Sequence, residues 1–324
     1  MFNTHSRLTI SDVAKKAGVS TGTVSRVLND RYGVKDSTKR RVLSVIDELG
    51  YRPDLSAREL SRQPMRIGLS LPSAAQRLAP FFMLFWEALT AHINADGYRI
   101  EQVANAVNGL PEYLCDAMVL FGAHDDDPRI PHLQGLGVPF VLIGHQKGVH
   151  AVCPDDYRGA RQACEHLLRL GHKDILFLSD VSGTQGSFDR YRGYRDALEQ
   201  AQLPIKSDFY LNGKFSTLEA YRALRRFLAT EQPFSAIFAA SDEMALGAIA
   251  ALEDGQLRIP LDVSVVGFDD LPGLAHNITT VRQDIDQIAK AAVDLLKASV
   301  NGEAARQITV PVTLIIRETT ARRR

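Results

Sequence analysis

A polar face on residues 21–29 carries the first recognisable chemistry in the chain. If this segment is helical, its side chains divide between two faces. One face is apolar and consists of Val24, Val27 and Leu28. The other consists of short or hydrogen-bonding residues and one arginine, namely Thr21, Gly22, Ser25, Arg26 and Asn29. Arginine can read guanine in the DNA major groove through two hydrogen bonds, so this face has the size and chemistry of a DNA-reading surface.

The residues before this face predict the element that holds it in place. An apolar helix face is formed at i, i+3, i+4 and i+7 by Ile10, Val13, Ala14 and Ala17. Gly18 then gives the backbone freedom that a tight turn needs, and Ser20 can cap a second helix. Two short helices joined by such a turn are typical of a helix-turn-helix. The alternative is an ordinary helical hairpin whose outer face is only solvated.

The order of residues from Asp12 to Asn29 favours the first interpretation. Asp-Val-Ala-x-x-Ala-Gly-Val-Ser-x-x-Thr-Val-Ser-Arg-Val-Leu-Asn resembles, without a gap, the DNA-binding signature of the lactose/galactose repressor (LacI/GalR) family of bacterial transcription factors. We expect base contacts from Thr21, Gly22 and Arg26, although readout at Gly22 must come from backbone or neighbours. Phosphate contacts are expected from Ser20, Thr23, Ser25, Asn29 and Tyr51.

A third helix is predicted over 36–49, and a short helical pattern follows over 54–62. An isolated helix of that length is unstable in water, and a charged linker is the simple alternative. Tyr51-x-Pro53-x-x-x-Ala57-x-x-Leu60 resembles the hinge helix of the family, in which Ala57 and Leu60 would enter the minor groove. Asp54 stands where the family usually has Asn, and its carboxylate would repel a phosphate there.

From residue 65 onward, short apolar runs alternate with helical patterns. Strands are predicted at 66–71, 98–103, 117–121, 140–143, 175–179, 209–211, 236–239 and 264–266. Helices are predicted from residue 81 for about 16 residues and at about 157–170, 190–201, 217–229 and 242–254. Alternation of this kind predicts an α/β fold with parallel sheets covered on both faces. Two such sets predict two lobes, with ligands bound at the carboxyl ends of the strands.

The resemblance extends through this body and implies a two-lobed fold like that of the periplasmic binding proteins. Its signatures are Val152-x-x-Asp155, 240–247, 265–270 and 279–283. It implies a DNA-binding domain at 1–53, a hinge at 54–64 and an effector-binding and dimerisation domain at 65–324. The lobes would be joined by crossings near 150–155 and 268–282, with a return near 284–300. Segment 104–115 is too short for the full helix that the family usually has there, so we expect that helix to be absent or reduced to a single turn.

Few residues are expected to contact an effector between the lobes. By position in the family they are Phe81, Phe82, Arg190, Ser241 and Asp269. An aromatic ring can stack on a sugar, an arginine fork can bond vicinal hydroxyls or a carboxylate, and an aspartate can accept from two hydroxyls. The alternatives are a core position for each Phe, a surface ion pair for Arg190 and a loop cap for Asp269. His124–Asp127 is interpreted as a solvated loop.

Composition and charge limit the remaining possibilities. An apolar share of 45% and a charged share of 23% are ordinary for a globular protein. Residues 1–63 hold 12 Lys and Arg against 7 Asp and Glu, whereas the remainder holds 26 against 31. Three unpaired cysteines and the lack of an export signal or membrane span indicate a cytoplasmic protein. No metal site, cofactor or catalytic motif is expected.

These observations predict a sequence-specific transcriptional regulator, most simply a repressor, and not an enzyme. It would bind a near-palindromic DNA operator as a homodimer, because one helix-turn-helix buries too little surface. A small effector, a sugar or oligosaccharide, would control operator affinity. The alternative is control by a protein partner with no functional sugar pocket. An enzyme with a fused DNA-binding head is the weakest hypothesis.

Overall fold

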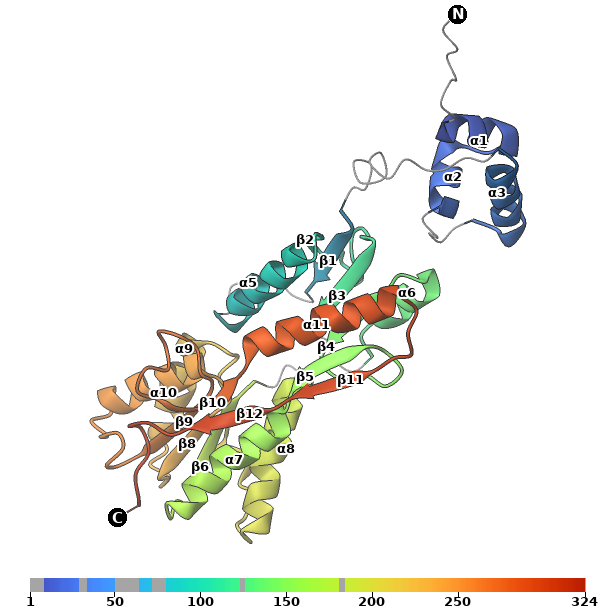
Figure 1. Ribbon diagram of the computed structural model, residues 1–324. Coiled ribbons are helices and arrows are strands. Elements are labelled where there is room, and N and C mark those ends of the chain that lie inside the picture. The colour runs from blue at the N-terminus through green and yellow to red at the C-terminus, as the bar shows by residue number, and fades with distance from the viewer. Residues whose placement is uncertain are drawn as a thin grey trace, which may run out of the picture. The chain divides into compact units, whose positions relative to one another are not determined.

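The computed structural model describes residues 9–28, 34–49, 64–71, 80–122, 126–180 and 184–323. The chain divides into two compact units, Met1–Pro64 and Met65–Arg324 (Figure 1). Asn29, Tyr51, Ala57, Leu60 and all of 54–63 lie outside the described residues. Among the helices that are described, none is long and apolar enough to cross a membrane.

The described residues of the first unit form three helices packed around one small core. They are α1 (Ile10–Ala17), α2 (Thr21–Leu28) and α3 (Asp36–Leu49). The buried residues are Val13, Ala14, Ala17, Val24, Val27, Val42 and Val45. Gly18 takes the left-handed conformation at φ +65° and ends α1, and Ser20 Oγ accepts a 3.1 Å hydrogen bond from Thr23 N at the start of α2. The predicted helix-turn-helix and third helix are therefore present with the expected faces inward.

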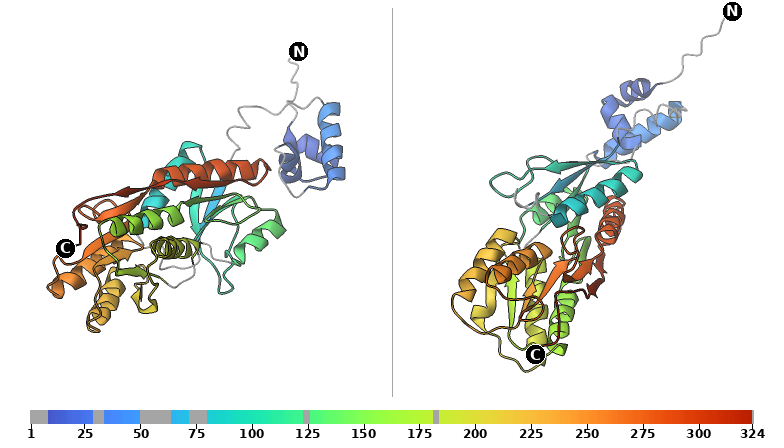
Figure 2. Two further views of the ribbon diagram at one scale, coloured as in Figure 1. Left: turned by 90° about the horizontal axis from the view of Figure 1, so that it is seen from below. Right: turned by 90° about the vertical axis from the view of Figure 1, so that its left-hand side faces the viewer.

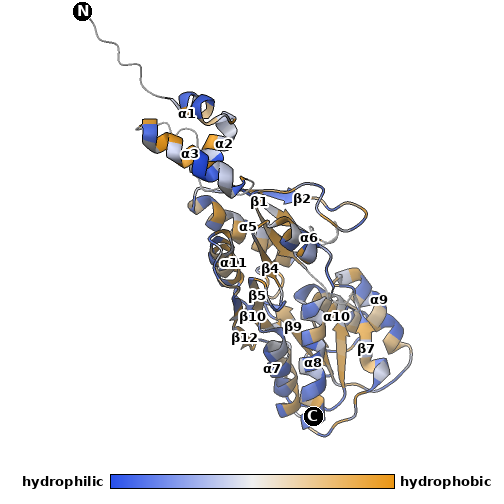
Figure 3. Ribbon diagram, turned by 90° about the vertical axis from the view of Figure 1, so that its right-hand side faces the viewer, coloured by the Kyte–Doolittle hydropathy of each residue, from blue (hydrophilic) through white to orange (hydrophobic). Residues whose placement is uncertain are grey.

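The first lobe of the body is a six-stranded sheet with helices on both faces. Its chain order is β1 (Arg66–Ser70), α5 (Pro80–Ala95), β2 (Arg99–Val103), β3 (Ala117–Phe121), α6 (Arg129–Leu136), β4 (Phe140–Ile143) and β5 (Ala151–Pro154). The strands lie in the order β11-β5-β4-β3-β1-β2, where β11 is Gln307–Val310. All of its strand pairs are parallel. Figure 3 shows the apolar strands between the more polar outer surfaces of the helices.

The second lobe repeats this architecture. Its elements are α7 (Asp156–Arg169), β6 (Ile175–Ser179), α8 (Gln185–Gln200), β7 (Tyr210–Asn212), α9 (Thr217–Leu228), β8 (Ala236–Ala239), α10 (Asp242–Asp254), β9 (Ser264–Asp269), β10 (Thr279–Gln283) and β12 (Val312–Ile315). The sheet order is β12-β10-β9-β8-β6-β7, and only β12 is antiparallel to its neighbour. Figure 2 shows α9 packed beside α10 on this lobe. The predicted two-lobed α/β fold is confirmed.

Three short connections join the lobes. One lies between β5 and α7, and a second at residue 284, between β10 and α11 (Ile285–Val300), which packs on the first sheet. The third is Pro311, between β11 and β12, which continue one another along the side of the body (Figure 1). A crossing was expected near 268–282, but β9 and β10 are neighbours in the second sheet, so the chain leaves that lobe only after Gln283.

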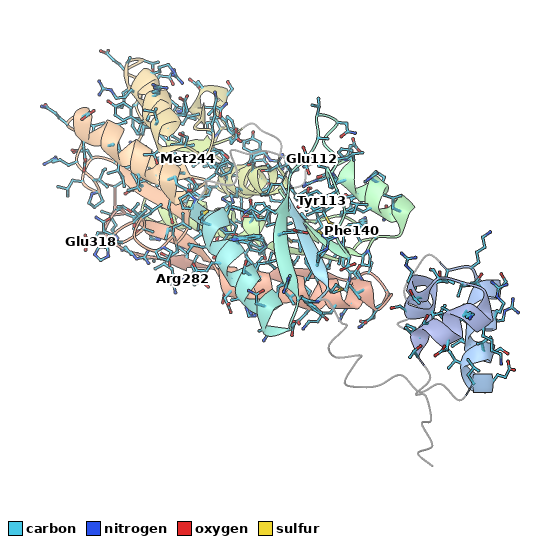
Figure 4. All side chains as sticks on the ribbon, turned by 90° about the horizontal axis from the view of Figure 1, so that it is seen from above. Glu112, Tyr113, Phe140, Met244, Arg282 and Glu318 are labelled. Atoms are coloured by element: carbon cyan, nitrogen blue, oxygen red, sulfur yellow. The ribbon has the colours of Figure 1, made fainter. Side chains whose placement is uncertain are left out.

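Segment 104–115 contains no helix, as expected. Side chains cover the sheet where relatives would have that helix. An isolated backbone bridge between Asn105 and Pro111 closes the loop, and the Tyr113 hydroxyl donates to the Gln102 carbonyl at 3.5 Å (Figure 4). A Cβ on Gly68 would lie 2.6 Å from Met118 Sδ and 3.0 Å from Cys115 Sγ. The sheet is therefore covered here by Met118 and Cys115, which pack directly on a glycine.

Two buried histidines hold the C-terminal residues against the second lobe. His166 Nε2 lies 3.0 Å from Thr320 Oγ1, and His172 bonds Ser235 Oγ at 3.1 Å and the Ala321 carbonyl at 3.0 Å. Burial lowers the pKa of both imidazoles. The folded chain thus holds them in their neutral form.

Replacing His172 by Gln should cost less stability as the solution becomes more acidic. The unaltered chain keeps the full contribution of neutral His172 above the ordinary histidine pKa of about 6.5. Below that value the unfolded chain binds the proton first, so the contribution is lost as the pH falls. Denaturant unfolding at several pH values between about 8 and about 5 measures the difference between the two proteins. The exposed His276, replaced by Gln, is the control. A difference for His172→Gln that grows toward acid would contradict this account.

Candidate functional site

A cavity of about 450 Å³ lies between the two lobes, where the carboxyl ends of both sheets meet. This size falls within the range of small-molecule sites. The five residues that the sequence predicted for an effector site all line it: Phe81, Phe82, Arg190, Ser241 and Asp269. They come from α5, α8 and the ends of β8 and β9, so the parallel strand topology brings together residues far apart in the sequence.

Arg190 is buried at the floor of this cavity and bonds to several elements of the second lobe. Its Nε donates to Asp156 Oδ1 at 2.7 Å, and its Nη1 donates to the Ala240 carbonyl. Nη1 also lies 3.5 Å from Asp269 Oδ1, and the guanidinium carbon lies 3.8 Å above the centre of the Phe268 ring. Burial opposes the charge on Arg190, but Asp156 and Asp269 outweigh it and raise its pKa. Arg190 is therefore a buried cation and not a surface ion pair.

Asp269 reaches the cavity from a backbone conformation that only the surroundings can maintain. It has φ +107°, and Asp270 follows with φ +57°. Asp270 is fixed by Arg282 and Arg317, each at 2.6 Å, while Gln283 Nε2 donates to Asp269 Oδ1. Strained non-glycine residues of this kind gather at binding sites. Burial raises the pKa of Asp269 well above its usual range, although Arg190 opposes the shift.

Two buried oxygens beside Asp269 accept no hydrogen bond from the described residues. They are Glu243 Oε2 and Gln283 Oε1, and both residues line the cavity. Neighbouring side chains do have partners: Ser241 Oγ accepts from Met244 N at 3.2 Å, and Asp242 accepts from Thr280 Oγ1 at 2.6 Å. A buried acceptor without a donor is costly, so this part of the cavity is suited to a ligand that donates.

The first lobe supplies an aromatic wall and one direct link to the second lobe. Phe82 packs edge to face on Phe121, with ring centres 5.3 Å apart. The ring centre of Phe81 lies 6.4 Å from that of Phe121. Phe82 is buried and Phe81 half-buried, so one ring belongs to the core while the other is more accessible. Across the cavity, His145 Nε2 meets Asp189 Oδ2 on α8 at 2.8 Å. The first lobe thus gives the cavity an apolar side formed by aromatic rings, and the second lobe gives it a polar side.

The surface predicted to read DNA lies on α2 in the first unit. Ser20, Thr21, Gly22 and Arg26 are exposed, and Thr23 and Ser25 are half-buried. A Cβ on Gly22 would meet only Ser20 Oγ, at 3.7 Å. Because Val24 and Val27 are buried, the polar side chains of α2 face outward as predicted.

Both parts of the chain resemble known protein families. Residues 9–54 match the model described as bacterial regulatory proteins, lacI family, and 164–320 match a periplasmic binding protein-like domain. A probable HTH-type transcriptional repressor ExuR of Bacillus subtilis (strain 168) is 31% identical over 87% of this chain and 88% of its own length. The chain belongs to the lacI family.

Solved structures of this family have the same fold. A complex of the transcriptional regulator CelR with cellobiose has a TM-score of 0.73 and 28% identity, covering 97% of this chain and 100% of that one. The lac repressor dimer bound to operator and the anti-inducer ONPF has a TM-score of 0.71 and 26% identity, over 97% and 99%. The lacI-family chain described here is accordingly a DNA-binding transcriptional regulator and not an enzyme.

The structure also brings to the cavity residues that the sequence analysis did not select. Among them are Phe121, Asp156, Asp180, Glu243 and Gln283. Phe121 and Asp180 stand at the ends of predicted strands, so the rule that ligands bind at carboxyl strand ends could have identified them. Asp156 follows a strand that was not predicted. Glu243 has no such signal, because a carboxylate in the first turn of a helix is ordinary.

One expectation about the first lobe of this lacI-family protein is wrong. Asp127 was placed in a solvated loop, but it is buried and binds the fully buried Arg129 at 2.6 Å. Arg129 also donates to the carbonyls of Ser70 at 2.8 Å and Phe121 at 3.2 Å. The pair is buried because Arg129 satisfies the carbonyl ends of two strands and needs a carboxylate to balance its charge.

Replacing Arg190 by Met should lower the free energy of unfolding by about 3–5 kcal/mol, since Asp156 and Asp269 would stay buried without their cation. The loss should shrink toward acid, where both carboxyls can take up protons. Arg192→Met is the control, because Arg192 is half-exposed and pairs with Asp189 at 3.2 Å. Its loss should cost less than about 1 kcal/mol. Denaturant unfolding measures the free energy of unfolding of both variants. Equal losses for Arg190→Met and Arg192→Met would contradict the role of Arg190 as the cation that balances the buried carboxylates.

Proposed function

We propose that this regulator is a cytoplasmic repressor whose affinity for operator DNA is controlled by a carbohydrate bound between its two lobes. The observation that carries the proposal is the 450 Å³ cavity with aromatic rings on one side and buried acceptors on the other. A sugar ring has an apolar face that can stack on an aromatic ring, and hydroxyls that can donate. Cellobiose in the CelR structure supports this class of ligand.

The DNA-binding part of the proposal assigns roles by position in the family. Thr21, Gly22 and Arg26 lie at base edges in the major groove. Phosphate contacts come from Ser20, Thr23, Ser25, Asn29 and Tyr51. Residues 54–64 form a hinge in which Ala57 and Leu60 enter the minor groove. Two copies of the chain bind a near-palindromic operator, and the lac repressor dimer bound to operator supports this arrangement.

Control is proposed to act through the arrangement of the two lobes. Along the described chain, three short connections join the lobes and each lobe has its own core, so the lobes can change their mutual angle without losing those cores. A ligand that touches both sides of the cavity binds one arrangement more tightly than another and shifts the population toward it. The pair of His145 and Asp189 spans the same gap and would be made or broken by that motion.

Arg26→Ala should weaken operator binding by about 1–3 kcal/mol and relax selectivity at one base pair in each half-site, because a bidentate contact to a base is lost. The operator is first selected from a random DNA library with the unaltered protein. Lys15→Ala is the control. Lys15 is also exposed, and its replacement removes one positive charge from α1 in the same unit. Fluorescence anisotropy against operator and single-base variants separates the two effects. Unchanged selectivity in Arg26→Ala would contradict the assignment.

A carbohydrate effector should raise the thermal midpoint of the full chain. At about a hundred times its dissociation constant a ligand adds roughly 2.7 kcal/mol of stability. Asp269→Asn should reduce this shift because an amide has no negative charge and offers the ligand one acceptor oxygen instead of two, whereas the exposed Asp208→Asn should keep it. Differential scanning fluorimetry with neutral mono- and disaccharides makes the measurement. A chain that responds to no sugar would favour control by a protein partner.

A further inference from the structure

The polar side of the cavity holds more buried carboxylates than cations. Among the described lining residues, Asp156, Glu243 and Asp269 are buried, and Arg190 is the buried cation beside them. Lys214, the other cationic lysine or arginine of the lining, is exposed. The floor of the cavity is therefore negative when its carboxylates are ionised, and Arg190 is already shared between Asp156 and Asp269.

The acceptors that remain lie beside this excess charge. Glu243 is 9% exposed and Gln283 is 4% exposed, and each has one oxygen without a hydrogen-bond donor among the described residues. Asp269 adds a carboxylate in contact with Gln283. A hydroxyl can donate one hydrogen bond to such an oxygen but brings no charge. An ammonium group donates three and also neutralises a carboxylate.

We propose that the cleft takes a polyhydroxylated ligand that carries a protonated amine, an amino sugar, with the ammonium group bound by Glu243, Gln283 and Asp269. This inference rests on the proposed carbohydrate site and names its charge class. The aromatic wall at Phe81 and Phe121 receives the ring, and the carboxylates receive the amine.

The electrostatics of the cleft agree with this assignment. Burial raises the pKa of Asp269, and Glu243 and Asp242 raise it further. The pKa of Asp242 itself is raised to about 6, again mainly by burial. Burial and mutual repulsion therefore disfavour the charged form of these carboxyls, and a cationic ligand would offset both. A ligand with its own carboxylate or phosphate would instead add to the repulsion.

The test compares ligands that share a ring and differ in charge. Full-length protein is titrated by calorimetry at pH 7 with glucose, galactose and mannose, and with the 2-amino and uronic acid forms of each. One 2-amino hexose should bind at least tenfold more tightly than its neutral parent, and no uronic acid should bind as tightly as the parent.

A matched pair of variants locates the effect. Glu243→Gln preserves shape and removes the charge, and it should reduce the preference for the amine at least fivefold. Glu253→Gln removes the same charge from the exposed end of α10 and should leave the preference unchanged. If neutral sugars bind as tightly as the amines, or a uronic acid binds best, the inference is overturned and the carbohydrate site stands. If no sugar of any charge binds, both fail.

Discussion

A single buried cation, Arg190, determines how the second lobe is assembled around the cleft. A guanidinium that has left water must be surrounded by acceptors, and here it bonds to residues that begin α7 and end β8 and β9. Those three elements can only meet at the carboxyl edge of the sheet. Satisfying Arg190 therefore brings Asp156 and Asp269 to the cleft, and their charge influences everything else that binds there.

The two lobes contribute different chemistry to one cavity. The first lobe brings rings from α5 and β3, held over an apolar core, and the second brings carboxylates and amides. A ligand that satisfies both must touch both, so its binding free energy depends on the angle between the lobes. This dependence is what allows a binding event in the cleft to bias a second site, because a ligand shifts an equilibrium only through differential affinity.

Much of the fold could be predicted because central strands are continuous apolar runs. The strands at 117–121, 140–143, 175–179 and 236–239 begin and end where the sequence predicted. Other elements lack that signal. Helix α6 contains Pro131 and Gly135 and has no clear apolar stripe, and β11 and β12 are short edge strands. The role of Arg129 depends on carbonyls 59 and 8 residues away, which no local pattern contains. The cleft residues that were expected from the family resemblance all line the cavity. Glu243 could not be selected from the sequence, because only its burial in the structure distinguishes it from an ordinary carboxylate in the first turn of a helix.

Coupling between the cleft and the DNA-reading helix is tested most directly by reciprocity. The affinity of the full chain for its selected operator is measured with and without saturating cleft ligand, and the affinity for the ligand is measured with and without saturating operator. Coupling between two sites requires the same factor in both directions, typically about 5- to 150-fold. We expect the ligand to change operator affinity, and the operator to change ligand affinity, by the same factor of at least about 5-fold. A ligand that binds the cleft with the same affinity whether or not operator is present would contradict it.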